Sequence, residues 1–180
     1  MSGEHIRPLV LIRHALPAID PRLPARAWPL SDEGREAARA LAERVRPLGV
    51  TRVVSSVEPK AWETGAIVAQ RLGVPCSAAA GLHEHDREGA PFLPADELER
   101  ALGELFARPD ELVYGRETAN QARDRFATAV GAVLTAYPDD RVAISSHGTV
   151  ISLLVAQRRG VDAHAFQQGL AMPDLVVINP

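Results

Sequence analysis

The stretch "LVLIRHALP", residues 9–17, decides the fold that this sequence predicts. Its first four residues are all aliphatic, and such a continuous run is typical of a strand that is buried on both faces of a sheet. The run then ends on Arg13 and His14. A buried strand that ends on a cation and a proton-carrying ring predicts that both groups are delivered to an active site.

The rest of the chain alternates between strand-like and helical patterns. The predicted strands are 8–14, 51–56, 75–80, 141–146 and 174–179. The predicted helices are 31–49, 59–73, 117–137 and 148–160, with one more near 95–107. This alternation favours an α/β fold, a three-layer α/β/α sandwich with a mostly parallel central sheet.

The length of 180 residues suits a single domain that spans residues 1–180. Residues 81–116 fit the alternation poorly, because they are rich in proline, glycine and charge. We expect this segment to form an insertion or lid over one edge of the sheet.

Composition excludes several classes of protein. The net charge of −3 argues against a general nucleic-acid binder, which needs a basic excess to neutralise phosphates. No stretch predicts a membrane span or a signal peptide, and Cys76 is the one cysteine. We therefore expect a cytoplasmic protein. The chain is also biased toward arginine, since 19 arginines accompany one lysine, Lys60.

Three predicted strands end on polar groups. The first ends on Arg13 and His14, the strand 51–56 leads into the helix that Lys60 opens, and the strand 141–146 leads into His147 and Gly148. Ligands of open α/β sheets bind outside the carboxyl ends of the strands, so parallel strands would bring these groups together. Cations, imidazoles and helix N-termini at one edge predict a site for a phosphate or a similar oxyanion.

Taken singly, these residues have plainer interpretations. A lone histidine at a strand end is more often a structural residue, and a lone arginine is more often half of a surface ion pair. Their convergence on one edge is what favours the functional interpretation.

Six motifs then occur in order, and together they resemble the histidine phosphatase superfamily, also called the phosphoglycerate mutase-like family. They are "LIRHA", "LSDEGREA", "SSVEPKAWET", "LHEHDREG", "GRET…R" and "SSHGTVI". The resemblance implies that His14 is the nucleophile and that Glu84 is the general acid and base. It also implies a phosphate site made by Arg13, Lys60, His147 and Gly148, with a catalytic part for His147. No metal and no cofactor are implied.

The sequence departs from the family pattern at two of these positions. Ala15 stands where the family favours glycine, and Lys60 stands where the family usually has a second arginine. Lysine keeps the charge but lacks the planar fork that binds two oxygens at once.

We therefore predict a metal-independent phosphomonoester hydrolase that forms a phosphohistidine on His14 and takes a small phosphorylated substrate. Phosphoglycerate mutase-type transfer is the alternative within the class, although residues 81–116 are a short insertion for a mutase. A second alternative is a phosphate-binding pseudo-phosphatase, because Lys60 replaces the arginine. A third is a metal-dependent hydrolase that uses the His83–Asp86 cluster. No pattern in the sequence indicates an oligomeric state.

Overall fold

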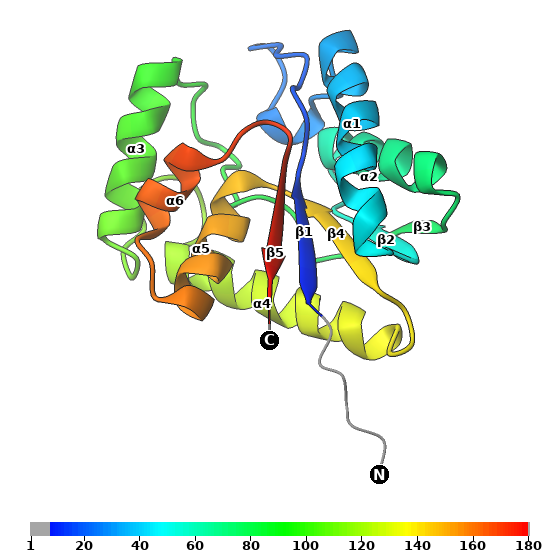
Figure 1. Cartoon of the computed structure of the whole chain (residues 1–180). Helices are drawn as coiled ribbons and strands as arrows, with labels where there is room; N and C mark the ends of the chain where they lie inside the picture. The colour runs from blue at the N-terminus through cyan, green and yellow to red at the C-terminus, as the bar shows by residue number, and fades with distance from the viewer. Residues whose placement is uncertain (1–7, 180) are drawn as a thin grey trace.

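The centre of the fold is a five-stranded sheet with the strand order β3-β2-β4-β1-β5 (Figure 1). The computed structural model describes residues 8–179 of the chain. Its strands are β1 (Leu9–Arg13), β2 (Arg52–Ser55), β3 (Cys76–Ala78), β4 (Val142–Ser146) and β5 (Asp174–Ile178). Each predicted strand is therefore present, somewhat shorter than the pattern indicated.

Four of the five strands run parallel. β4 pairs with β1 on one side and with β2 on the other, and β2 pairs with β3, each time in parallel. β5 is antiparallel to β1 at the edge of the sheet. The carboxyl ends of β1, β2 and β4 therefore meet at one edge, as the placement of the polar residues required.

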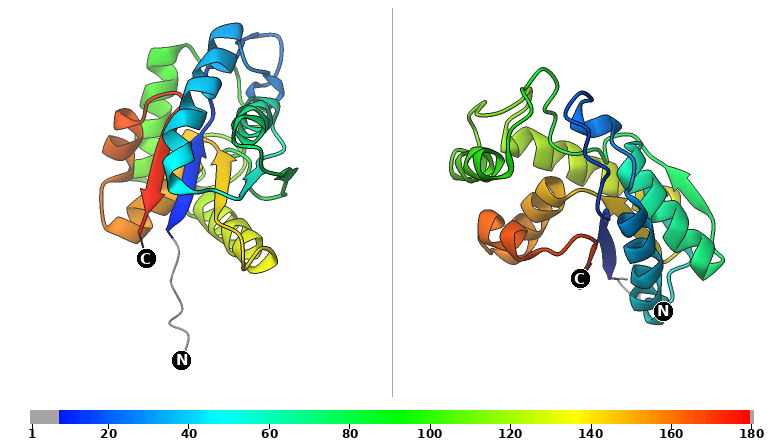
Figure 2. Two further views of the ribbon diagram at one scale, coloured as in Figure 1. Left: turned by 45° about the vertical axis from the view of Figure 1, so that its right-hand side comes forward. Right: turned by 90° about the horizontal axis from the view of Figure 1, so that it is seen from above.

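Helices cover both faces of the sheet, which confirms the predicted three-layer α/β/α sandwich. The helices are α1 (Asp32–Val45), α2 (Pro59–Leu72), α3 (Ala95–Ala107), α4 (Ala119–Ala136), α5 (Gly148–Arg159) and α6 (Ala163–Gly169), with 3₁₀ turns η1 (Ala25–Ala27) and η2 (Arg46–Leu48). Seen from above, α1 and α2 lie on one side of the sheet and α3 to α6 on the other (Figure 2).

The side chains of β1 alternate between two hydrophobic cores. Val10 and Ile12 pack with α1 and α2, whereas Leu11 packs with α4 and α5 on the opposite face. All three side chains are fully buried. This double burial is why the run 9–12 is uniformly aliphatic rather than alternating.

Two helical segments differ from the prediction. The helix expected over 31–49 begins as predicted, with the Ser31 hydroxyl accepting a hydrogen bond from Gly34 N, but α1 ends at Val45. Pro47 has no amide hydrogen for an α-helical bond, and the chain continues as η2 to Gly49, whose φ is 63°. The short helix α6 was not predicted at all.

Residues 81–116 contain the one helix that was expected there, α3 at Ala95–Ala107. The loop before it returns to the carboxyl edge of the sheet. Its role as an insertion or lid stays a prediction. Among residues 8–179, no helix combines the length and the apolar character that crossing a membrane requires.

Candidate active site

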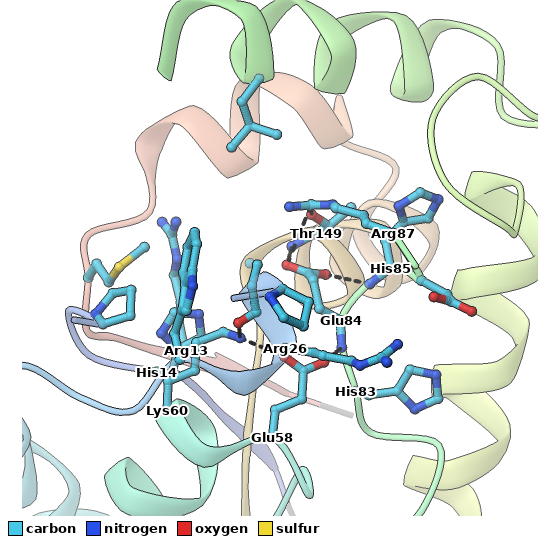
Figure 3. Close-up of a pocket in the computed structure, with 18 of the residues that line it drawn as sticks. Arg13, His14, Arg26, Glu58, Lys60, His83, Glu84, His85, Arg87 and Thr149 are labelled. Carbon is cyan, nitrogen blue, oxygen red and sulfur yellow. Dashed lines mark hydrogen bonds and ion pairs between the residues drawn. The ribbon is translucent and has the colours of Figure 1, made fainter. Parts of the chain in front are cut away.

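A cavity of about 640 Å³ lies at the carboxyl edge of the parallel strands. Five of the six predicted site residues line it: Arg13, His14, Lys60, Glu84 and Gly148. The sixth, His147, is fully buried beside the cavity, with its ring centroid 5.1 Å from that of His14. Figure 3 shows Arg13, His14 and Lys60 on one side of the cavity and Glu84 on the other.

His14 is held as a neutral imidazole with a defined tautomer. Its Nδ1 lies 2.7 Å from the carbonyl oxygen of Ala15, so Nδ1 carries the hydrogen and donates it. The lone pair is then on Nε2. Burial, reinforced by the neighbouring ring of His147, lowers the pKa of His14 to about 3. At neutral pH the ring is therefore unprotonated, which is the state a nucleophile needs.

The loop under His14 is fixed by a short chain of hydrogen bonds. Ala15 N donates to Thr64 Oγ1 (3.0 Å), and the Thr64 hydroxyl donates to the carbonyl of Lys60 (2.7 Å). Ala15 is fully buried and needs no left-handed backbone conformation, since every described residue with positive φ is a glycine. Alanine in place of the family's glycine thus causes no backbone strain here.

His147 is the second buried imidazole of the site. Its Nε2 shares a hydrogen bond with the Ser56 hydroxyl (2.9 Å), and its Nδ1 has no partner. Burial lowers the pKa of His147 to about 3, although the carboxylate of Glu84 opposes the shift. The two rings meet edge to face at 64°, and both are neutral at physiological pH.

Arg13 packs against the first residue of α5. A Cβ atom on Gly148 would lie only 3.1 Å from Arg13 Nε, so the glycine leaves room for the guanidinium. One end of that group donates to the carbonyl of Leu170 (2.7 Å), whereas Nε is buried without a partner. An unused donor beside a helix N-terminus is suited to bind an oxyanion.

Lys60 is buried and already paired. Its Nζ donates to Glu58 Oε2 (2.6 Å) and to the carbonyl of Ala25 (2.7 Å). An ammonium has three hydrogens, so one donor remains for a ligand. The other oxygen of Glu58 accepts a hydrogen bond from the backbone of Glu84 (3.0 Å). Glu58 therefore joins the Lys60 side of the cavity to the Glu84 side (Figure 3).

Glu84 lies against the N-terminus of α5. Its carboxylate accepts hydrogen bonds from the backbone nitrogens of His85 (2.8 Å), Thr149 (3.2 Å) and Val150 (3.3 Å). Burial alone would raise the pKa of Glu84, but Arg87, His147 and these backbone donors together hold it well below its ordinary range. In the ligand-free site Glu84 is thus a carboxylate, ready to act as a base.

Two residues from the motif "GRET…R" fix the loop that carries Glu84. Arg125 donates to the carbonyls of Gly81 (2.8 Å), His83 (3.0 Å) and Glu84 (3.0 Å), and it also pairs with Glu117. Three carbonyl groups of the loop are therefore anchored to α4. In the motif "GRET…R", Glu117 and Arg125 thus support the loop that carries Glu84, and neither residue lines the cavity.

Sequence reasoning missed two residues of this site. Glu58 was not singled out, although a carboxylate two residues before the one lysine of an arginine-rich chain was a usable signal. Arg87, within the motif "LHEHDREG", was not among the predicted site residues either: it lines the cavity, donates to Thr149 Oγ1 (3.0 Å) and lies 3.9 Å from Glu84 Oε2.

The cluster His83–Asp86 does not assemble as a metal site. His85 is buried with Nε2 2.7 Å from the carbonyl of Glu117, and Asp86 lines the cavity. Across residues 8–179, no three His, Cys, Asp or Glu side chains come together in a way that could hold a metal ion.

A family model matches almost the whole described chain. The model of the histidine phosphatase superfamily (branch 1) covers residues 9–178. This chain belongs to the histidine phosphatase superfamily. The resemblance that the six motifs indicated is thereby confirmed.

Relatives within the superfamily carry phosphatase and mutase names. The chain is 28% identical over 134 residues to a protein of Bacillus subtilis named uncharacterized phosphatase PhoE, covering 74% of this chain. It is 27% identical over 142 residues to a probable phosphoglycerate mutase GpmB of Cronobacter sakazakii, covering 76% of this chain. Each match spans 66% of the relative's length, slightly less than two thirds.

A solved structure in the superfamily shares the fold. A mycobacterial glucosyl-3-phosphoglycerate phosphatase superimposes with a TM-score of 0.76 at 20% identity, covering 95% of this chain and 89% of the other. At this identity the likeness concerns the architecture alone.

Proposed function

We propose that this histidine phosphatase hydrolyses small phosphomonoesters through a phosphohistidine on His14. The observation that carries the proposal is the hydrogen bond from His14 Nδ1 to the carbonyl of Ala15, which leaves an unprotonated Nε2 in a cavity that also contains Arg13 and Lys60. A neutral imidazole beside fixed cations can attack phosphorus, because the cations stabilise the charge on the transferring group.

The first half-reaction transfers the phosphoryl group to the enzyme. The lone pair of His14 Nε2 forms the N–P bond while the P–O bond to the alcohol breaks, and the departing alkoxide takes a proton. Glu84 is the proposed donor of this proton. The ligand-free carboxylate is ionised, and it takes up one proton from solvent as the phosphoryl dianion binds, because like-charge repulsion raises its pKa.

The second half-reaction returns the enzyme to its starting state. Water attacks phosphorus, its proton passes to the Glu84 carboxylate, and the N–P bond breaks to release inorganic phosphate and the neutral ring of His14. As phosphate leaves, Glu84 releases this proton to solvent, which returns the proton that was taken up on substrate binding. The proposal therefore includes no metal ion and no cofactor.

The deciding experiment is hydrolysis of para-nitrophenyl phosphate in excess EDTA. We expect turnover by the wild type and a loss of at least about 1000-fold in His14→Ala. His164→Ala is the matched control, because His164 lies on α6 and pairs with Glu99 at the surface. Radiolabelled phosphate retained on wild-type protein after an alkaline quench, and absent from His14→Ala, would identify the phosphohistidine. Turnover that EDTA abolishes would reject the metal-independent scheme.

A second candidate is a phosphate-binding protein with little turnover. It is favoured by the pairing of Lys60 with Glu58, which neutralises the cation that stands where the family usually has arginine. This candidate predicts that the wild type binds inorganic phosphate without hydrolysing esters. It also predicts that Lys60→Arg restores turnover. Hydrolysis of phosphate esters by the wild type, which has Lys60, would reject this second candidate.

A further inference from the structure

The cavity above the phosphate site has an apolar wall. We define the floor as Arg13, His14, Lys60 and Glu84. The wall comes from four parts of the chain: the loop after β1, the loop after β2, helix α3 and the loop before β5. Its members are Leu16, Ile19, Trp28, Val57, Leu98 and Met172.

Several wall residues are exposed although they are apolar. Leu16 is 40% exposed, Ile19 61% and Val57 60%, and all three line the same cavity. Single exposed apolar residues are ordinary, but their convergence on one concave surface marks a place where an apolar ligand group can be buried.

Trp28 is the part of the wall that is anchored by side-chain hydrogen bonds. Its Nε1 donates to the carbonyls of Asp20 (2.9 Å) and Leu23 (3.2 Å), and its ring packs edge to face on Phe92 with centroids 6.2 Å apart. The indole is therefore held in place before any ligand arrives. A ligand that packs on it loses little free energy to ordering of this side chain.

The charges at the mouth of the cavity are already paired. One oxygen of Glu88 accepts from Arg26 (2.8 Å) and the other from Arg116 (2.8 Å). Arg87, farther in, is engaged by Thr149 and Glu84. Among the described residues that line the cavity above the floor, both arginines, Arg26 and Arg87, are ion-paired. The buried Nε of Arg87 has no hydrogen-bond partner among the described residues, whereas Asp86 and Glu88 add negative charge.

We propose that the substrates are phosphomonoesters of apolar alcohols, alkyl or aromatic, that carry no second anionic group. The proposal rests on the proposed function and names the substrate class of the same site. The apolar wall would bury the alcohol, and the paired arginines and the two carboxylates disfavour a second negative charge. Phosphoglycerates, which the names of several relatives mention, fall outside this class.

The test compares three esters with primary alkoxide leaving groups, so that differences report on binding of the alcohol. They are 2-phenylethyl phosphate, glycerol 3-phosphate and 3-phosphoglycerate. We expect kcat/KM for the phenylethyl ester to exceed that for glycerol 3-phosphate by about 10- to 100-fold. We expect 3-phosphoglycerate to be the poorest substrate of the three.

Two tryptophans provide a matched pair of variants. Trp28→Ala is expected to lower the ratio of kcat/KM between 2-phenylethyl phosphate and glycerol 3-phosphate by about tenfold. Trp62→Ala is expected to leave the ratio unchanged, because Trp62 lies on α2 and does not line the cavity. In Glu88→Ala, Arg26 and Arg116 lose their shared partner, and we expect kcat/KM for 3-phosphoglycerate to rise about two- to fivefold.

The possible failures are distinct. If the enzyme hydrolyses all three esters but prefers glycerol 3-phosphate or 3-phosphoglycerate, the substrate class is wrong and the phosphatase proposal stands. If none of the three esters nor para-nitrophenyl phosphate is hydrolysed, the proposed function itself is overturned. An unchanged substrate ratio in Trp28→Ala would overturn the part assigned to the wall.

Discussion

Glu58 and Lys60 form a buried ion pair, with Glu58 Oε2 2.6 Å from Lys60 Nζ and with side chains that are 10% and 7% exposed. They are separated by Pro59 at the start of α2. Because the second oxygen of Glu58 also holds the backbone of Glu84, the pair connects the two sides of the cavity. Lysine at this position is thus part of a two-residue unit rather than an isolated replacement of arginine.

This pair predicts an asymmetric response to mutation. Glu58→Leu leaves the Lys60 ammonium buried without its counter-ion, and we expect a loss of about 3–5 kcal/mol in the free energy of unfolding. The double variant Glu58→Leu/Lys60→Met should recover much of this loss, since no unpaired charge remains. Urea denaturation measures both. The control is Glu104→Leu, which breaks an exposed pair with Arg108 and should cost no more than about 1 kcal/mol. Equal losses in the single and double variants would contradict the interpretation.

Gly148 is predicted to be required for the position of Arg13. In Gly148→Ala the new Cβ lies 3.1 Å from Arg13 Nε and 3.2 Å from Cζ, so the guanidinium must move. We expect kcat/KM to fall about tenfold, which corresponds to about 1.4 kcal/mol of lost transition-state stabilisation. Gly131→Ala is the control: it meets no atom within 4 Å, lies in α4, and should stabilise the protein by about 0.5–1 kcal/mol without changing kcat/KM.

The two buried imidazoles predict acid lability. The pKa values of His14 and His147 are lowered to about 3 in the folded protein, compared with about 6.5 in an unfolded chain. Between these values the unfolded chain binds more protons, so the free energy of unfolding falls as the pH drops from about 6.5 toward 3. Each ring contributes up to about 1.4 kcal/mol per pH unit. Denaturation between pH 7 and pH 4 measures the slope. His147→Asn should reduce it, and an unchanged slope would refute the assignment.

Anion binding is predicted to be coupled to proton uptake. A dianion beside His14, His147 and Glu84 raises the pKa of each group, so all three effects have the same sign. Sulfate is the appropriate probe, because its own charge is constant between pH 5 and 8. Calorimetry in buffers of different ionisation enthalpy should show net uptake near pH 5.5 and tighter binding as the pH falls. Glu84→Gln should lower the uptake; release of protons by the wild type would be inconsistent with this site.

Arg125 is predicted to act as a positioning residue for Glu84. Arg125→Met leaves three carbonyls of the Glu84 loop without a donor, and we expect a loss of about 3 kcal/mol in stability. We also expect kcat to fall more than sulfate affinity, with partial rescue by Arg125→Lys. The control is Arg123→Met, two residues away, where the pairing with Asp124 is exposed. If kcat were unchanged in the folded variant, the positioning role would be rejected.

The sequence predicted the elements that are buried on both sides. Continuous aliphatic runs identified β1, β2 and β4, and the rule that ligands bind at the carboxyl ends of strands brought Arg13, His14, Lys60 and Gly148 together correctly. The predicted start of a helix at residue 31 was also correct, because the Ser31 side chain caps α1. These features are local or follow from topology, and a single sequence records them directly.

The remainder depends on contacts between distant segments. The seven-residue helix α6 has no buried residue, so its sequence shows no apolar periodicity from which a helix could be predicted. The antiparallel direction of β5 is defined by its pairing with β1, which lies at the other end of the described chain. Arg87 lies in the cavity because Thr149, 62 positions away in the chain, accepts its hydrogen bond. Contacts between residues this far apart in the chain cannot be predicted from local sequence patterns.

The fixed ring of Trp28 also makes the protein its own optical probe. The chain has two tryptophans, and Trp62 is on the outer part of α2, away from the cavity lining. In Trp62→Phe a single indole remains, in contact with whatever fills the cavity. Because indole emission depends on the polarity of its surroundings, occupancy can be read as a fluorescence change. Ligands that bind without being turned over become visible in this way, with no label attached.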